Sequence, residues 1–114
     1  MVSVEFFEDR DKMLKAFKFT GHAEAAPYGE DLVCSAISVL SQTAVIGLQH
    51  YLHKKPKLEI EAGLLSCILP DGLNEQEQER SQTILKTMEL GLEALKPKYG
   101  NYFKLHKRRW TECL

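Results

Sequence analysis

Cysteine is scarce in this sequence, and the arrangement of the few cysteines disfavours several classes of protein. Cys34, Cys67 and Cys113 make an odd number among 114 residues, and no two of them form a CxxC pair. A disulfide-stabilised secreted domain and a thiol redox module are therefore disfavoured. This cysteine usage favours a reducing cytoplasm, in which thiols stay reduced.

Long apolar runs and a charge excess are also lacking. The N-terminus, MVSVEFFEDRDK, has no basic start followed by an apolar run, so we expect no signal peptide. We find no stretch approaching the roughly 18 apolar residues of a membrane span. The formal net charge of −1 gives no global reason to expect a nucleic-acid partner. The length and composition predict one domain over residues 1–114.

The periodicity of the apolar residues predicts seven elements in the order ββαββαβ. A period of 3.6 residues predicts helices over 31–53 and about 74–96. The second helix begins with a capping-box pair, Asn74 and Glu77, and Pro97 is expected to end it. Alternation predicts strands near residues 2–6, 13–20, 57–63, 64–69 and 102–107. We expect an α+β fold with a largely antiparallel sheet and both helices packed on one face.

The first predicted helix is apolar on two sides, which is more than one sheet can cover. One stripe contains Val33, Ile37, Leu40, Ala44, Leu48 and Tyr51, and the other contains Leu32, Ala36, Val39, Thr43 and Ile46. We therefore expect a homodimer, in which a second copy of the chain covers the stripe that the sheet leaves open.

The segment GHAEAAPYGEDLVCSAIS, residues 21–38, carries the residues best suited to chemistry. It places His22 at the end of a strand and Cys34 in the predicted first turn of a helix. A thiol there faces the positive end of the helix dipole, which lowers its pKa, and nearby N–H groups can form an oxyanion hole. A cysteine activated by one histidine can act as a nucleophile. Asp31 could cap the helix or orient the histidine, and we favour the cap.

Each of these residues also has a structural interpretation. A lone cysteine in a helix is more often a core residue than a nucleophile, and His22 could be an ordinary turn residue. Ser38 could bond to a helix carbonyl. Cys34 nevertheless lies on a polar strip with Ser38, Ser41 and Gln42, which is unusual for a core thiol.

The other two cysteines and the histidines suggest no further site. Cys67 falls in a strand and Cys113 near the terminus, so both are interpreted as structural or incidental. Together with Cys34 and the histidines they could supply zinc ligands, but no pair has the usual zinc spacing. We therefore expect no metal and no cofactor.

The motif GHA-x5-G-x-D-x-x-C-x-x-x-S resembles the signature of the Prp family, the bacterial ribosomal-processing cysteine proteases. The matching residues are Gly21, His22, Ala23, Gly29, Asp31, Cys34 and Ser38. The resemblance extends to the whole chain, because the length and the ββαββαβ order also fit.

This resemblance implies a cysteine peptidase that removes a short N-terminal extension from a large-subunit ribosomal protein. It implies that Cys34 is the nucleophile and His22 the base, with Asp31, Ser38, Gly21 and Gly29 as supporting or substrate-binding residues. It further implies a homodimer, and a loop between the histidine and the cysteine that closes over the peptide.

A second function remains open at this point. Between Lys96 and Arg109 there are six basic residues and no acid, with Tyr99, Tyr102 and Trp110 close by in the sequence. Basic residues interleaved with aromatic ones can bind RNA. The alternative is therefore a non-catalytic ribosome-assembly factor that binds RNA or a ribosomal protein through its C-terminal strand.

Overall fold

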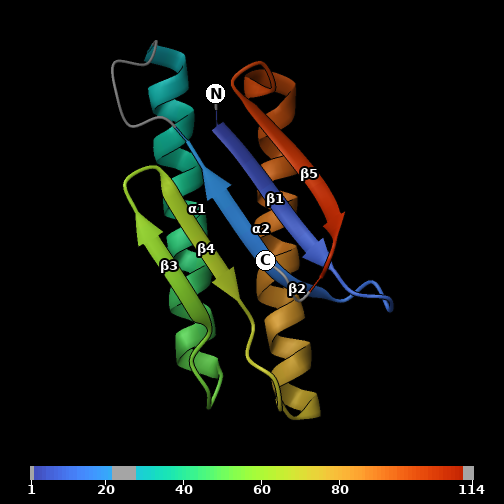
Figure 1. Cartoon of the computed structure of the whole chain (residues 1–114). Coiled ribbons are helices and arrows are strands. Elements are labelled where there is room, and N and C mark those ends of the chain that lie inside the picture. The colour runs from blue at the N-terminus through green and yellow to red at the C-terminus, as the bar shows by residue number, and fades with distance from the viewer. Residues whose placement is uncertain (1, 22–27, 112–114) are drawn as a thin grey trace.

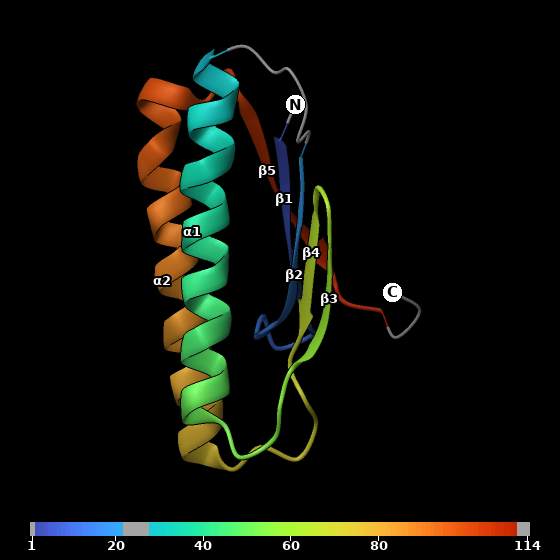
Figure 2. The same ribbon diagram turned by 90° about the vertical axis from the view of Figure 1, so that its left-hand side faces the viewer.

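The computed structural model describes residues 2–21 and 28–111. It contains β1 (Val2–Glu8), β2 (Leu14–Thr20), α1 (Tyr28–Tyr51), β3 (Lys57–Glu61), β4 (Leu64–Ile68), α2 (Glu75–Tyr99) and β5 (Phe103–Arg109) (Figure 1). Both helices cover the same face of the sheet, and the other face is open (Figure 2). The predicted ββαββαβ order and α+β class are confirmed.

The five strands form one sheet in the order β3-β4-β2-β1-β5. The neighbouring strands are antiparallel except for β1 and β5, which are parallel because α2 carries the chain back to the starting end of the sheet. Thr20, at the end of β2, pairs with Leu64, at the start of β4. This register brings the turn between β3 and β4 to the point where β2 ends.

The core lies between the sheet and the two helices. The aromatic residues Phe6 and Phe17 face the helices from the central strands, with ring centroids 6.3 Å apart. The helices contribute aliphatic side chains that are fully buried, Ile37 and Leu48 from α1 and Leu85 and Leu92 from α2. Burying a side chain of this kind contributes about 1.5–3 kcal/mol. This packing fixes α1 against the sheet and thereby sets where Cys34 lies.

The first helix begins earlier than predicted. It starts at Tyr28, so Asp31 lies inside its first turn and is not the N-cap, and Cys34 lies in the second turn. Gly29 belongs to the same helix, which the sequence predicted to begin only at residue 31. Acidic residues in a first turn are favoured by the helix dipole, and Asp31 supplies one. Residues 22–27, with most of the expected closing loop, lie outside the described residues.

The second helix also extends beyond its predicted end. It continues through Pro97 to Tyr99, so the proline does not terminate it. A proline near the end removes one N–H donor, and the final turn still closes because the N–H of Gly100 donates to the Lys96 carbonyl at 2.9 Å. The capping box of Asn74 and Glu77 is confirmed.

A hydrogen-bonded pair joins the end of α1 to the start of α2. The Glu77 carboxylate accepts the His53 N–H at 2.6 Å and contacts His53 Nδ1 at 2.7 Å. These backbone and side-chain hydrogen bonds lower the pKa of Glu77 to about 2. The pair fixes the relative placement of the helices at the end of the molecule opposite Cys34.

The hydropathy of α1 corrects one expectation from the sequence. The segment Asp31–Tyr51 has a mean hydropathy of 1.6, so its length and composition would allow it to cross a membrane. A core helix of a soluble protein passes the same test, and α1 packs its buried stripe against the sheet. One helix of this kind is weak evidence for a membrane span.

Candidate active site

Cys34 lies at a small cavity between α1 and the end of the sheet. The half-buried thiol shares a cavity of about 170 Å³ with other side chains of α1, with the end of β2 and with the hairpin formed by β3 and β4. The lining residues are Phe19, Gly21, Cys34, Ser38, Ser41, Gln42, Ile60, Glu61, Gly63, Leu64 and Leu65. One wall is therefore polar and helical, and the opposite wall is made by strands and is largely apolar.

Gly21 brings the end of β2 against the sulfur. A Cβ placed on Gly21 would lie 3.4 Å from Cys34 Sγ, so even the smallest side chain at this position would contact the thiol. His22 follows Gly21 directly in the sequence and itself lies outside the described residues. The sulfur thus lies beside Gly21, the residue that directly precedes the predicted base in the sequence.

Ser38 and Gln42 form the helical wall beyond the thiol. Ser38 lies one turn after Cys34, and its hydroxyl oxygen accepts a hydrogen bond from Gln42 Nε2 at 2.8 Å. Both side chains line the cavity. Ser38 thus faces the cavity and does not serve only to bond the helix backbone.

Ser41 is a cavity residue that we did not select from the sequence as a candidate. It is fully buried, and its hydroxyl has no hydrogen-bond partner within the described part of the chain. A buried polar group left without a partner destabilises a fold by about 1–3 kcal/mol. The sequence signal was its place on the polar strip with Cys34, two turns further along the helix.

Asp31 is a motif residue that lies apart from the cavity. Asp31 is exposed, lies one turn before Cys34 and does not line the cavity. Gly29 lies in the first turn of α1. The structure therefore brings Gly21, Cys34 and Ser38 together and leaves Asp31 outside this group.

Cys67 has the environment of a structural cysteine. It lies in β4, is buried in the core, and burial raises the pKa of its thiol to about 12. A thiol with this pKa is almost entirely protonated at neutral pH and therefore unreactive. Cys113, also predicted to be structural or incidental, lies outside the described residues.

The described residues show no cluster suited to a metal. No three histidine, cysteine, aspartate or glutamate side chains gather within residues 2–21 and 28–111.

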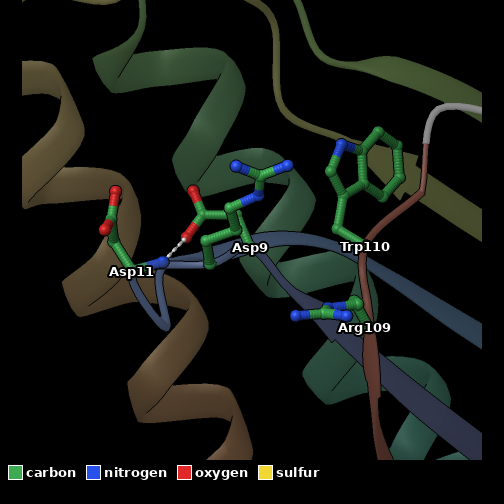
Figure 3. A pocket seen from close by; sticks show the side chains of 5 residues that line it. Asp9, Asp11, Arg109 and Trp110 are labelled. Carbon is green, nitrogen blue, oxygen red and sulfur yellow. Dashed lines mark hydrogen bonds between the residues drawn. The ribbon is translucent and has the colours of Figure 1, made fainter.

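A wider hollow of about 620 Å³ lies at the far end of the sheet, near the β1–β2 turn and the end of β5. Figure 3 shows Asp9, Asp11, Arg109 and Trp110 around it, with the Asp11 N–H donating to Asp9. Its side chains carry both signs of charge and include no thiol. This hollow is separate from the cavity at Cys34.

Half of the basic residues in the C-terminal segment are bound to acidic side chains of the same chain. Lys96 contacts Glu93, and Arg108 pairs with Glu5 on the neighbouring strand. Lys107 contacts the buried Glu89 at 3.0 Å. These pairs reduce the positive charge that this segment could offer to RNA.

The sequence is similar to proteins of known family. The family description Cysteine protease Prp matches residues 1–104. A Bacillus subtilis (strain 168) protein named ribosomal processing cysteine protease Prp is 27% identical over 107 residues, which cover 92% of this chain and 96% of that protein.

The fold is similar to solved structures. A crystal structure of the S. aureus ribosomal processing protease Prp with a substrate peptide has a TM-score of 0.81 at 19% identity and covers 95% of this chain and 100% of that one. The same S. aureus protease with a covalently linked product peptide has a TM-score of 0.77 at 20% identity, again covering 95% and 100%. A Streptococcus mutans protein, SMU.848, has a TM-score of 0.80 at 23% identity and covers 96% and 99%.

Proposed function

Because the chain belongs to the cysteine protease Prp family, we propose that it removes a short N-terminal extension from a large-subunit ribosomal protein, with Cys34 as nucleophile and His22 as base. Membership in this family makes the chain a cysteine protease. The observation that supports Cys34 is the placement of its sulfur at a cavity, beside Gly21 and within a half-buried site. The buried Cys67, with its raised pKa, has no such access.

The reaction proceeds through an acyl-enzyme. The Cys34 thiolate attacks the scissile carbonyl carbon, forms a C–S bond and moves an electron pair onto the carbonyl oxygen. Collapse breaks the C–N bond, and His22 donates a proton to the leaving amine. Water gives a proton to His22 and attacks the thioester carbon, and breaking the C–S bond releases the carboxylic acid and regenerates the Cys34 thiolate beside protonated His22.

The helix dipole assists this thiolate less than the sequence predicted. Dipole effects fall off within the first turn of a helix, and Cys34 lies in the second turn. More of the activation must therefore come from His22. Ser38, Asp31, Gly21 and Gly29 remain our candidates for supporting or substrate-binding residues, and Ser38 and Gly21 reach the cavity.

The ribosomal substrate is proposed from the relatives. The B. subtilis relative is named a ribosomal processing protease, and an S. aureus Prp structure contains a substrate peptide. We expect the reaction to take place in the cytoplasm, where ribosomes assemble and thiols stay reduced. No cofactor enters the proposed chemistry.

Mass spectrometry of the ribosomal protein tests the proposed substrate. Mixing the chain with a large-subunit ribosomal protein that carries an N-terminal extension is expected to yield a shortened protein and a released N-terminal peptide. A matched sample of the same protein without its extension is expected to keep its mass. An unchanged mass in both samples, from a chain that is folded, would contradict the substrate assignment and favour the assembly-factor alternative.

We also propose that the chain is a homodimer formed through the outer face of α1. On this face Leu32, Val39 and Ile46 are 47%, 65% and 64% exposed, so the sheet leaves the second apolar stripe uncovered as the sequence predicted. An exposed apolar face of this kind is a common mark of a protein interface.

Sedimentation at micromolar protein is expected to give a dimer that dissociates on dilution. Lysine at both Val39 and Ile46 is expected to shift the chain to monomer, because two charges would be buried in the interface. Lysine at Gln49, an exposed polar position on α1, serves as the matched control and should leave the dimer intact. A wild-type chain that sediments as a monomer at every concentration would contradict the proposal.

A further inference from the structure

The turn between β3 and β4 is in direct backbone contact with the end of β2. The N–H of Gly21 donates to the carbonyl oxygen of Gly63 at 3.0 Å. Gly63 has a φ of +74°, and a Cβ placed on it would lie 2.5 Å from the carbonyl oxygen of Gly21. Real Cβ atoms essentially never approach so closely, so glycine is required here for two reasons, its backbone conformation and the close approach.

Three side chains surround Gly21 on the side away from Gly63. A Cβ placed on it would lie 3.4 Å from Cys34 Sγ, 3.3 Å from Phe19 Cζ and 3.4 Å from Val2 Cγ2. Gly21 is therefore enclosed by Gly63 on one side and by the thiol and two buried side chains around it. A side chain at Gly63 would displace the Gly21 carbonyl and so move the end of β2 relative to the sulfur.

We propose that Gly63 is a positioning residue for the peptidase reaction, which holds the Gly21 backbone against the Cys34 thiol. The inference rests on the proposed function for its effect on turnover. The missing side chain of Gly63 lets the hairpin close onto Gly21, and the hydrogen bond between them fixes the end of β2.

Gly72 provides a matched control for the backbone strain. It also has a positive φ, +77°, and lies in the connection between β4 and α2. A Cβ placed on Gly72 would meet Lys54 Nζ at 2.8 Å, which is the far end of a flexible and exposed side chain. Substitutions at the two glycines therefore share the strain of a positive φ, and only those at Gly63 push on the site.

The experiment compares Gly63→Asn and Gly63→Ala with Gly72→Asn and Gly72→Ala. Asparagine tolerates a positive φ better than alanine does. The two asparagine variants therefore still introduce a Cβ at the close contact but with less backbone strain. Peptide cleavage, thermal melting and the pH profile of Cys34 alkylation by iodoacetamide are measured for each. A misplacement of reacting groups by about 1 Å can reduce a rate roughly 10²-fold. We therefore expect kcat to fall about 10²-fold in folded Gly63 variants. The Gly72 variants are expected to stay within about twofold of the wild-type kcat, and only the Gly63 variants should change the alkylation profile.

Several outcomes would overturn the proposal. Folded Gly63 variants with the wild-type kcat and alkylation profile would do so, as would equal losses in the Gly63 and Gly72 variants. If the Gly63 variants do not fold, Gly21→Ala is used instead, because its side chain would contact the sulfur directly. An unchanged pH profile of Cys34 alkylation in Gly21→Ala would also contradict the proposal. If the wild-type chain cleaves no peptide, the proposed function fails, and the alkylation profiles of the same variants still decide whether Gly63 positions the thiol.

Discussion

Replacing Cys34 with alanine is expected to abolish peptide cleavage while the chain stays folded. Loss of the nucleophile removes the acyl-enzyme pathway, and comparable nucleophile knockouts in proteases lower kcat by far more than 10⁴-fold, so we expect a loss of at least roughly that size. The thiol is half-buried at the edge of an existing cavity, so its removal opens little new core volume. We expect the free energy of unfolding to change by less than about 1 kcal/mol. Steady-state cleavage and thermal melts measure the two effects.

Cys67→Ala is the matched control for this substitution. Cys67 is buried in the core, so its truncation is expected to lower the free energy of unfolding by about 1–2 kcal/mol and to leave turnover largely unchanged. The two cysteines should thus show opposite patterns of activity and stability. Full cleavage by Cys34→Ala, or a loss of cleavage explained only by unfolding, would remove Cys34 from the mechanism.

Replacing His22 with alanine is expected to lower kcat/KM by roughly 10²–10⁴-fold, which corresponds to about 3–5 kcal/mol of barrier. In the proposed mechanism the imidazole stabilises the thiolate and supplies the proton that the leaving amine needs. A residual rate is expected because the helix N-terminus still favours some thiolate, although the second-turn position of Cys34 makes this contribution small. The loss should therefore lie toward the upper part of the range and remain smaller than that of Cys34→Ala.

The pH dependence and a second histidine test the role of His22. The wild-type rate should depend on a group that titrates near neutrality, and His22→Ala should lose that dependence. His106→Ala is the control, because His106 is exposed on β5 and does not line the cavity. Equal turnover and an unchanged pH profile in His22→Ala would exclude it as the base.

Most of the fold could be predicted because its signals are local in the sequence. Alternating apolar residues marked the strands, and the pair of Asn74 and Glu77 marked the start of α2. The errors fell at helix ends, where competing local signals meet. Asp31, the favoured cap, indicated the start of the first helix, which begins at Tyr28. Pro97 indicated the end of the second helix, although the loss of one N–H in its final turn is tolerated.

Only the site residues that belong to the sequence motif could be predicted. Cys34 and Ser38 are one helical turn apart, so their shared face follows from spacing alone, and both reach the cavity. The contact of Gly63 with Gly21 joins residues about forty positions apart and depends on the register of β2 with β4. The unpartnered hydroxyl of Ser41 depends on how α1 packs against the sheet. Neither feature has a local sequence signal strong enough to identify it.

The most direct test of the central claim is to follow peptide cleavage while the thiols are alkylated. Iodoacetamide is added in increasing amounts, and mass spectrometry of the digested chain reports how much of each cysteine is modified. We predict that cleavage falls in proportion to the modification of Cys34, while Cys67, whose pKa burial raises to about 12, stays unmodified in the folded chain. Complete modification of Cys34 with cleavage unchanged would contradict the account.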